Sequence, residues 1–367
     1  AQAQAPSYRL MYYSHAPFLL ARSSLPTCLE VLVLFHGVCH GARIYGLLWA
    51  GHEGLPQPLA SNRLWRMQVQ ESAWHSHSFE AEAAVLSVDF GPSGRALTGA
   101  SNGLVQLWCI NSSRELQRFV GHAGPVESVK FSPEGDKVLT ASRDRTVRLW
   151  NVDSGQELSR FEGHTDAVMS AVFSPNGTHI LSGSHDRTAR LWSSGSGVEL
   201  RRFYHRKPIL SVALRPHSEN LEGFVGFYGG LVKFWTIQSR DDRRVMWAHK
   251  GDVNSVAYSG EGSLALTSSS DGTAAILDAD TGVCILRLLG HSDVVTSAAF
   301  SPDGSLVTSA SADLTARIWD AFTGAELRSF SDRRHPVLSV AFDPDDDHDG
   351  VLAGAGNAAL LLDVSSL

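Results

Sequence analysis

A segment of 30 residues that recurs at a fixed spacing constrains this chain more than any other feature. Residues 121–150 read GHAGPVESVKFSPEGDKVLTASRDRTVRLW, residues 163–192 read GHTDAVMSAVFSPNGTHILSGSHDRTARLW, and residues 290–319 read GHSDVVTSAAFSPDGSLVTSASADLTARIW. A period near 40 residues indicates copies of one supersecondary unit, which bury their apolar faces against one another.

Turn residues divide the unit into four short strand patterns. Residues 126–131 and 137–142 flank a Ser-Pro-Glu-Gly turn, residues 146–150 alternate apolar and polar side chains, and residues 157–161 follow a second glycine turn. A sheet of four short strands cannot bury both faces alone, whereas sheets arranged radially pack on their neighbours. We therefore predict an all-β fold, a β-propeller of four-stranded antiparallel blades.

Two dipeptides mark the ends of each unit. Gly-His opens it at residues 121, 163 and 290, and Trp followed by Asn, Ser or Asp closes its third strand at residues 150, 192 and 319. In this the repeats resemble those of the WD-repeat family. The resemblance implies a propeller whose ring is closed by an N-terminal strand that completes the last blade.

The position of the third-strand tryptophan sets the expected number of blades. It is filled at intervals of 42 or 43 residues by Trp65, Trp108, Trp150, Trp192, Trp235, Leu277, Trp319 and Leu362. This favours eight repeats, at approximately residues 40–75, 81–119, 122–161, 164–203, 205–247, 249–288, 291–330 and 333–367. Residues 1–28 are then an N-terminal extension, residues 29–367 one propeller domain, and residues 29–35 the ring-closing strand. The alternative is seven blades, with residues 72–75 closing the ring and the first segment packed outside.

The resemblance also implies a hydrogen-bonded network in each regular repeat, from Trp through Ser and His to Asp. Ser, His and Asp together could suggest nucleophilic catalysis, but an enzyme needs one such site and this chain has three copies. We therefore expect a structural network and no enzyme. Its members are His122, Ser142, Asp144 and Trp150; His164, Ser184, Asp186 and Trp192; and His291, Ser311, Asp313 and Trp319.

One acidic segment resembles the start of a calcium loop. Asp345, Asp347 and Asp349 precede Gly350, but Gly356 stands at the twelfth position, where a calcium loop carries Glu. A solvated acidic hairpin is the favoured interpretation, and a calcium-linked regulatory module is an alternative. We expect no metal and no cofactor.

The family resemblance implies that partners bind the narrower top face of the ring. Residues just before the turn aspartate, and residues early in each first strand, point there. In this chain they include Arg143, His185, Tyr228, Met169, Glu127 and Asn254, a mixture of types enriched at binding surfaces. We therefore predict a non-catalytic scaffold that binds a protein or peptide, within a larger assembly in one version of this hypothesis.

Composition limits the other functions. The net charge of −7 disfavours the alternative of a nucleic-acid-binding propeller. The longest apolar run, residues 31–35, is too short to span a membrane, and the four cysteines have no paired spacing. We expect a cytoplasmic or other intracellular location. Export is the alternative, because the first residues, AQAQAPS, resemble the end left by signal-peptide cleavage.

Overall fold

The chain divides into two compact units, which are described separately. The computed structural model describes residues 77–364, apart from 219–220, 238–243, 333 and 345–349, together with five short strands nearer the N-terminus. Contacts assign residues 1–68 to the first unit and residues 69–365 to the second. None of the described residues forms a helix long and apolar enough to cross a membrane.

The first unit contains a small antiparallel sheet and a short β-ladder. The sheet has the order β1 (Met11–Tyr13), β2 (Ala16–Ala21), β3 (Leu32–Leu34), and β4 (Val38–Cys39) pairs with β5 (Ala42–Arg43).

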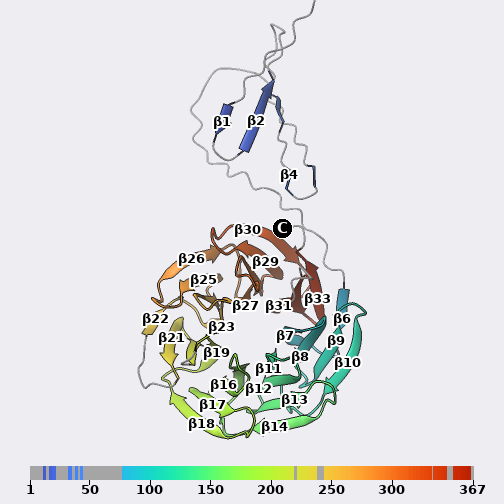
Figure 1. Cartoon of the computed structure of the whole chain (residues 1–367), viewed down its shortest axis with the longest axis vertical. Coiled ribbons are helices and arrows are strands. Elements are labelled where there is room, and N and C mark those ends of the chain that lie inside the picture. The colour runs from blue at the N-terminus through green and yellow to red at the C-terminus, as the bar shows by residue number, and fades with distance from the viewer. Residues whose placement is uncertain are drawn as a thin grey trace, which may run out of the picture. The chain divides into compact units, whose positions relative to one another are not determined.

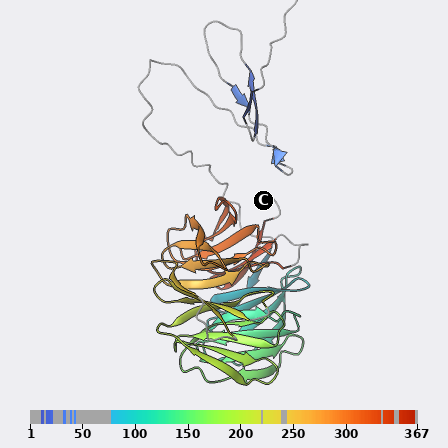
Figure 2. The same ribbon diagram turned by 60° about the vertical axis from the view of Figure 1, so that its left-hand side comes forward.

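The described part of the second unit, residues 77–364, is a ring of seven four-stranded antiparallel sheets around a central axis (Figure 1). Figure 2 shows the same ring obliquely, with each blade stacked on the next. Blade 1 is β7 (Val85–Gly91), β8 (Arg95–Ala100), β9 (Val105–Cys109) and β10 (Arg114–Phe119); blade 2 is β11 (Val126–Phe131), β12 (Lys137–Ser142), β13 (Val147–Asn151) and β14 (Glu157–Phe161); blade 3 is β15 (Val168–Phe173), β16 (His179–Ser184), β17 (Thr188–Ser193) and β18 (Glu199–Tyr204).

The remaining blades follow the same order, except that the last takes its fourth strand from the start of the unit. Blade 4 is β19 (Ile209–Leu214), β20 (Glu222–Phe227), β21 (Leu231–Thr236) and β22 (Arg244–Trp247); blade 5 is β23 (Val253–Tyr258), β24 (Leu264–Ser269), β25 (Thr273–Asp278) and β26 (Cys284–Leu289); blade 6 is β27 (Val295–Phe300), β28 (Leu306–Ser311), β29 (Thr315–Asp320) and β30 (Glu326–Ser331); blade 7 is β31 (Val337–Phe342), β32 (Gly350–Ala355), β33 (Ala358–Asp363) and β6 (His77–Glu80).

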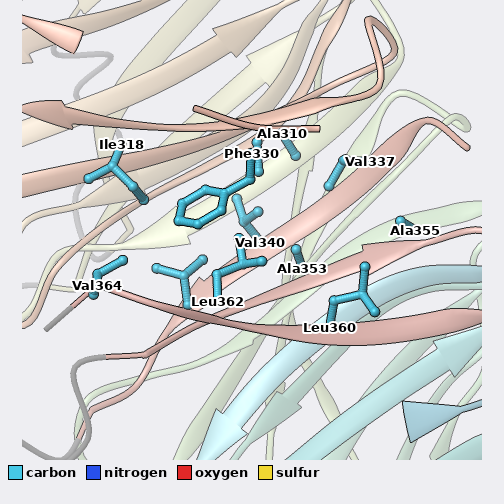
Figure 3. Packing of buried hydrophobic residues seen from close by; sticks show 12 residues of the cluster. Ala310, Ile318, Phe330, Val337, Val340, Ala353, Ala355, Leu360, Leu362 and Val364 are labelled. Atoms are coloured by element: carbon cyan, nitrogen blue, oxygen red, sulfur yellow. The ribbon is translucent and has the colours of Figure 1, made fainter. Parts of the chain in front are cut away.

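Burial along the strands follows from this radial packing. The second strand of a blade lies between two neighbouring blades, so β12 is buried on both faces over its last five residues. The outermost strand has one face toward solvent, and β14 alternates exposed and half-buried side chains until Phe161. The interior between blades 6 and 7 shows the same principle: Phe330 of β30 lies among Ile318, Val340 and Leu362 (Figure 3).

A serine stands at the same position of every innermost strand, and in six of the seven blades its Oγ bonds the backbone of an adjacent blade. The register shifts by one residue between the first and third residues of each innermost strand, leaving the second residue unpaired as a β-bulge. The serine follows this bulge. Ser211 Oγ accepts a bond from Val256 N at 3.0 Å, and Ser339 Oγ accepts one from Val88 N at 3.1 Å, which joins the last blade to the first.

The eight-blade interpretation is wrong, and the seven-blade alternative is confirmed. The outer edge of β33 is paired with β6, through Leu360 opposite Ser78 and Ala359 opposite Phe79. Residues 29–35 therefore do not close the ring; their described part, β3, pairs with β2 instead. Four residues suffice for closure because Phe79 is fully buried against Trp108 of blade 1, with ring centroids 5.8 Å apart.

Two related predictions fall largely on residues whose placement is not described. The proposed first repeat, residues 40–75, has only β5 among the described residues, and the alternative closing segment, residues 72–75, lies outside them. The observed closing strand begins two residues after that segment, at His77.

We expect closure by β6 to separate two truncations. A chain of residues 69–367 should keep a cooperative thermal transition, because every blade retains its four strands. A chain of residues 83–367 loses β6 and exposes the edge of β33, so it should unfold at a lower temperature or aggregate. Scanning calorimetry and light scattering measure both effects. Equal stability of the two chains would contradict closure by β6.

Candidate functional site

Two sets of loops meet on one end of the ring, which we call the top face. It consists of the loop before each innermost strand and the turn between the second and third strands. In blade 2, Ser142 Oγ donates to Gly124 O at 3.0 Å, and Arg143 N donates to Pro125 O at 2.9 Å. These bonds fix the loop to the turn, so residues of both can present one surface.

A buried chain of hydrogen bonds runs from the top face into blade 2. Trp150 Nε1 donates to Thr140 Oγ1 at 2.9 Å, and Thr140 Oγ1 lies 2.6 Å from His122 Nε2. His122 Nδ1 lies 2.7 Å from Asp144 Oδ2. The same chain recurs in blade 3 through Trp192, Ser182, His164 and Asp186, and in blade 6 through Trp319, Ser309, His291 and Asp313.

The hydroxyl that bridges tryptophan and histidine in these hydrogen-bonded networks is not the predicted one. Ser142, Ser184 and Ser311 lie two residues after the bridging hydroxyls of Thr140, Ser182 and Ser309. Each of these serines accepts instead from the backbone N–H of the turn aspartate, at 3.0–3.1 Å, and donates to a carbonyl of the preceding loop. The two positions share one face of the strand because they are two residues apart, but Thr140 lies at mid-strand beside Trp150, whereas Ser142 ends β12 next to the turn. Hydroxyls at the bridging position recur in phase and were the available signal.

Burial and hydrogen bonding set the charges of this network. Burial opposes ionisation of Asp144 and Asp186, but the bonds from histidine and threonine outweigh it and hold the pKa of both carboxyls well below its usual range. Burial also opposes ionisation of Asp271 in blade 5, yet its bonds to Thr273 and to the backbone of Lys250 lower its pKa to about 2.

Burial lowers the pKa of the His164 and His249 imidazoles, and their aspartates offset this only in part. A neutral imidazole with its proton on Nδ1 fits the bonds around His164. The hydroxyl of Ser182 then accepts from Trp192 and donates to Nε2. A network whose members are all paired with one another stabilises the fold and leaves no free nucleophile or base.

The sequence analysis did not assign a role to an arginine that stands two residues before the tryptophan. Arg190 is buried above the Trp192 ring, with its guanidinium carbon 5.9 Å from the ring centroid. It donates to Glu199 Oε2 and to Gly163 O, both at 2.7 Å. The signal was the in-phase recurrence of arginine in TVRLW, TARLW and TARIW.

The innermost strands of all seven blades enclose a central cavity of about 430 Å³. Three of the predicted surface residues, Glu127, Met169 and Asn254, are bulge residues that line it. Glu127 forms an ion pair with Arg143 of the adjoining turn, whose side chain is 57% exposed. Asn254 Nδ2 donates to Val295 O of the next blade at 2.8 Å, so this side chain also holds two blades together.

The other predicted residues lie on the top face beside the cavity. His185 and Tyr228 occupy equivalent turns of blades 3 and 4, and their ring centroids are 5.5 Å apart in an edge-to-face arrangement. His185 Nε2 is buried and has no hydrogen-bond partner among the described residues. The structure thus places Arg143 with Glu127, and His185 with Tyr228, on three consecutive blades.

Comparison with known families agrees with this geometry. The family described as WD domain, G-beta repeat (WD40) matches residues 72–109, 113–151, 155–193, 241–278 and 282–320, more than half of the chain. This chain belongs to the WD-repeat family. Each match starts shortly before the outermost strand of one blade and ends at the last residue of the third strand of the next, as in residues 72–109, which include β6 to β9. The search of curated proteins found no match.

The calcium candidate of this WD-repeat chain cannot be placed. Asp345, Asp347 and Asp349 lie outside the described residues. Among the described residues, histidine, cysteine and carboxylate side chains form no group of three that could hold a metal ion.

We expect Asp144→Ala to destabilise the propeller. The substitution leaves the buried Nδ1–H of His122 and the amide and hydroxyl of Thr146 without their acceptor, and each unsatisfied buried donor costs about 1–3 kcal/mol. Denaturant unfolding should therefore show a loss of roughly 2–4 kcal/mol. Asp153→Ala, in an exposed turn on the other side of the ring, is the control, and an equal effect of the two substitutions would contradict the structural role.

We also expect stability to fall in two stages on acidification. His164 and His249 have folded pKa values below the unfolded value of about 6.5, so the unfolded chain binds more protons below that pH and stability decreases. The network aspartates, with lowered pKa values, add a second decrease below about pH 4. Unfolding at pH 8 to 3 measures this. In His164→Gln the free energy of unfolding should decrease less steeply in the first stage. An unchanged dependence on pH there would show that His164 does not titrate as inferred.

Proposed function

We propose that this propeller is a non-catalytic scaffold that binds a protein or peptide on its top face. The proposed surface consists of Arg143, His185 and Tyr228 on the turns of the top face, and of Glu127, Met169 and Asn254, which line the central cavity. WD-repeat propellers generally serve as protein-interaction scaffolds, and that general role is the starting point.

The observation that supports the proposal most strongly is the contrast between adjacent turn positions. The turn aspartate recurs in blades 2, 3, 5 and 6 and is held in the buried network. The residue just before it differs in every one of these blades: Arg143, His185, Ser270 and Ala312. The backbone of this position bonds the preceding loop in each blade, but its side chain takes no part in the buried network and can vary to suit a partner. Arginine and tyrosine are enriched where binding energy is concentrated.

The cavity supports binding rather than catalysis as its role. The charged residues that line it in the described structure are Asp89, Lys130 and Glu127. Lys130 is paired with Asp89, and Glu127 is paired with Arg143. The serines that line it recur in every blade, and six of the seven bond the backbone of an adjacent blade. This is the arrangement of a packed, paired channel wall, whereas an active site concentrates unpaired titratable groups at one place.

Affinity capture from the native source tests the proposal. The intact chain is compared with the triple variant Arg143→Ala/His185→Ala/Tyr228→Ala by mass spectrometry. A control triple, Glu134→Ala/Asp153→Ala/Ser196→Ala, changes exposed turns away from the top face. We expect the first triple to recover a specific protein partner at least about tenfold less, the effect of losing one or more central contacts.

Two outcomes would contradict the proposal. Recovery of the same partner by both triple variants would show that the partner does not bind through the three substituted top-face residues. Recovery of RNA or DNA in place of a protein, with binding that falls steeply as salt rises, would favour a nucleic-acid-binding propeller. Thermal unfolding of all three chains establishes first that each is folded.

A further inference from the structure

One position on the outer rim of the top face is apolar on three consecutive blades. It is the last residue of the outermost strand, opposite the start of the third strand. Blades 3, 4 and 5 carry Tyr204, Trp247 and Leu289 there, with exposed fractions of 75%, 68% and 66%. Blades 2 and 6 have Glu162 and Ser331 at this position. Large apolar side chains gathered on one exposed arc are typical of an interaction surface.

The middle of this arc, blade 4, lacks the buried network of its neighbours. Val225 stands where Thr140 bridges tryptophan and histidine in blade 2, and Gly229 stands where Asp144 accepts from histidine. Trp235 Nε1 is consequently buried with no hydrogen-bond partner among the described residues. Residues 194–240, which contain β19 to β21, also fall between the ranges that match the family.

The turn glycine of blade 4 makes room for a lysine from the preceding loop. A Cβ atom at Gly229 would lie 2.7 Å from Lys207 Nζ, so a side chain there would displace the ammonium group. From this place Lys207 Nζ lies 4.8 Å from the centroid of the Trp247 ring, a cation–π contact. Tyr228 precedes Gly229 and contacts His185, so the surface continues from the rim toward the cavity.

The loop before blade 4 carries two cations, where two of the equivalent loops carry an aspartate. Lys207 occupies the position of Asp166 before blade 3 and of Asp293 before blade 6, two residues after the loop histidine in each case. Arg206 is its neighbour, and Lys250 follows the histidine of the next loop. Among the described residues none of these three cations forms an ion pair with a carboxylate. In a chain of net charge −7, these two loops carry three cations and one carboxylate, Asp252, whose Oδ1 accepts a bond from Gly229 N at 2.7 Å.

We propose that Tyr204, Lys207, Tyr228 and Trp247, with Arg206 and Lys250, form a rim site that binds an acidic peptide segment of a partner protein. The inference rests on the proposed function and assigns the chemistry of the partner. An apolar or aromatic side chain of the peptide packs on Trp247 and Tyr204. Its carboxylates pair with Lys207, which leaves the indole face, and with Arg206 and Lys250. Charge complementarity of this kind selects acidic segments and speeds their association.

The full chain can be tested with a displayed library of random twelve-residue peptides, followed by titration of an enriched peptide labelled with fluorescein. We expect enrichment of peptides rich in Asp and Glu that contain Phe, Trp or Leu. Trp247→Ala and Lys207→Glu should each weaken the labelled peptide at least about tenfold, the size expected for a central contact. Lys207→Met keeps the aliphatic stem without the charge. The difference in peptide affinity between Lys207→Met and the intact chain should become smaller as the salt concentration is raised.

The matched control is Val120→Ala, which removes an equally exposed apolar residue at the same position of blade 1. It should bind the peptide as the intact chain does. Because Trp247 is largely exposed, Trp247→Ala should also keep the unfolding temperature, so that a loss of binding is not a loss of folding.

Failure of the rim site and failure of the scaffold function give different results. Enriched peptides without an acidic bias, no enrichment over the bare support, or full binding by Trp247→Ala and Lys207→Glu would each overturn the rim site. Peptides that are lost with Glu127→Ala and Met169→Ala instead would place binding at the cavity and leave the scaffold function standing. The scaffold function itself fails only when the capture experiment recovers no protein through the top face.

Discussion

Pairing of the last blade with the first strand of the ring is the constraint on which the rest of the structure depends. In blade 7, one edge of β33 pairs with β32, and the four residues of β6 pair with the other edge. Each blade buries its faces only against its neighbours, so an open ring would expose two blade faces and one strand edge. Closure therefore stabilises all the blades at once, and it also fixes the position of every loop on the top face.

Much of this architecture could be predicted from the sequence, because the repeat period and the turn residues recur in phase. The number of blades could not, since Trp65 continues the tryptophan spacing beyond the seven blades of the described ring, into residues outside the described part of the chain. A periodic pattern shows where units of similar sequence lie, whereas ring closure depends on which strand fills the last edge. β6 has only four residues and begins with His77, so its sequence resembles a linker. Its pairing with β33 and the burial of Phe79 show that it is a strand.

The positions of the candidate site residues in the repeat could be predicted from the sequence, but the contacts of their side chains could not. The turn residues Arg143 and His185 were identifiable from their place before the turn aspartate, and Tyr228 from the equivalent place before Gly229. The structure adds their partners: Arg143 pairs with Glu127, and the rings of His185 and Tyr228 contact each other. The rim residues Trp247 and Lys207 were not found. They lie 40 residues apart and belong to a blade that lacks the turn aspartate and the bridging hydroxyl, so in-phase comparison gave no signal for their contact.

The departures of blade 4 can be understood from what the regular blades require. A turn that holds the buried network needs a carboxylate, and Asp144, Asp186 and Asp313 each accept bonds from histidine, threonine and a loop amide. Such a turn keeps its aspartate in place, whereas the residue before the aspartate varies between blades. Blade 4 has Gly229 in place of the carboxylate, and Lys207 reaches the space that a side chain would fill. Without the network, the loop, the turn and the rim of blade 4 need not keep the shape of the regular blades, so they can present a different surface from those of blades 3 and 5 beside it.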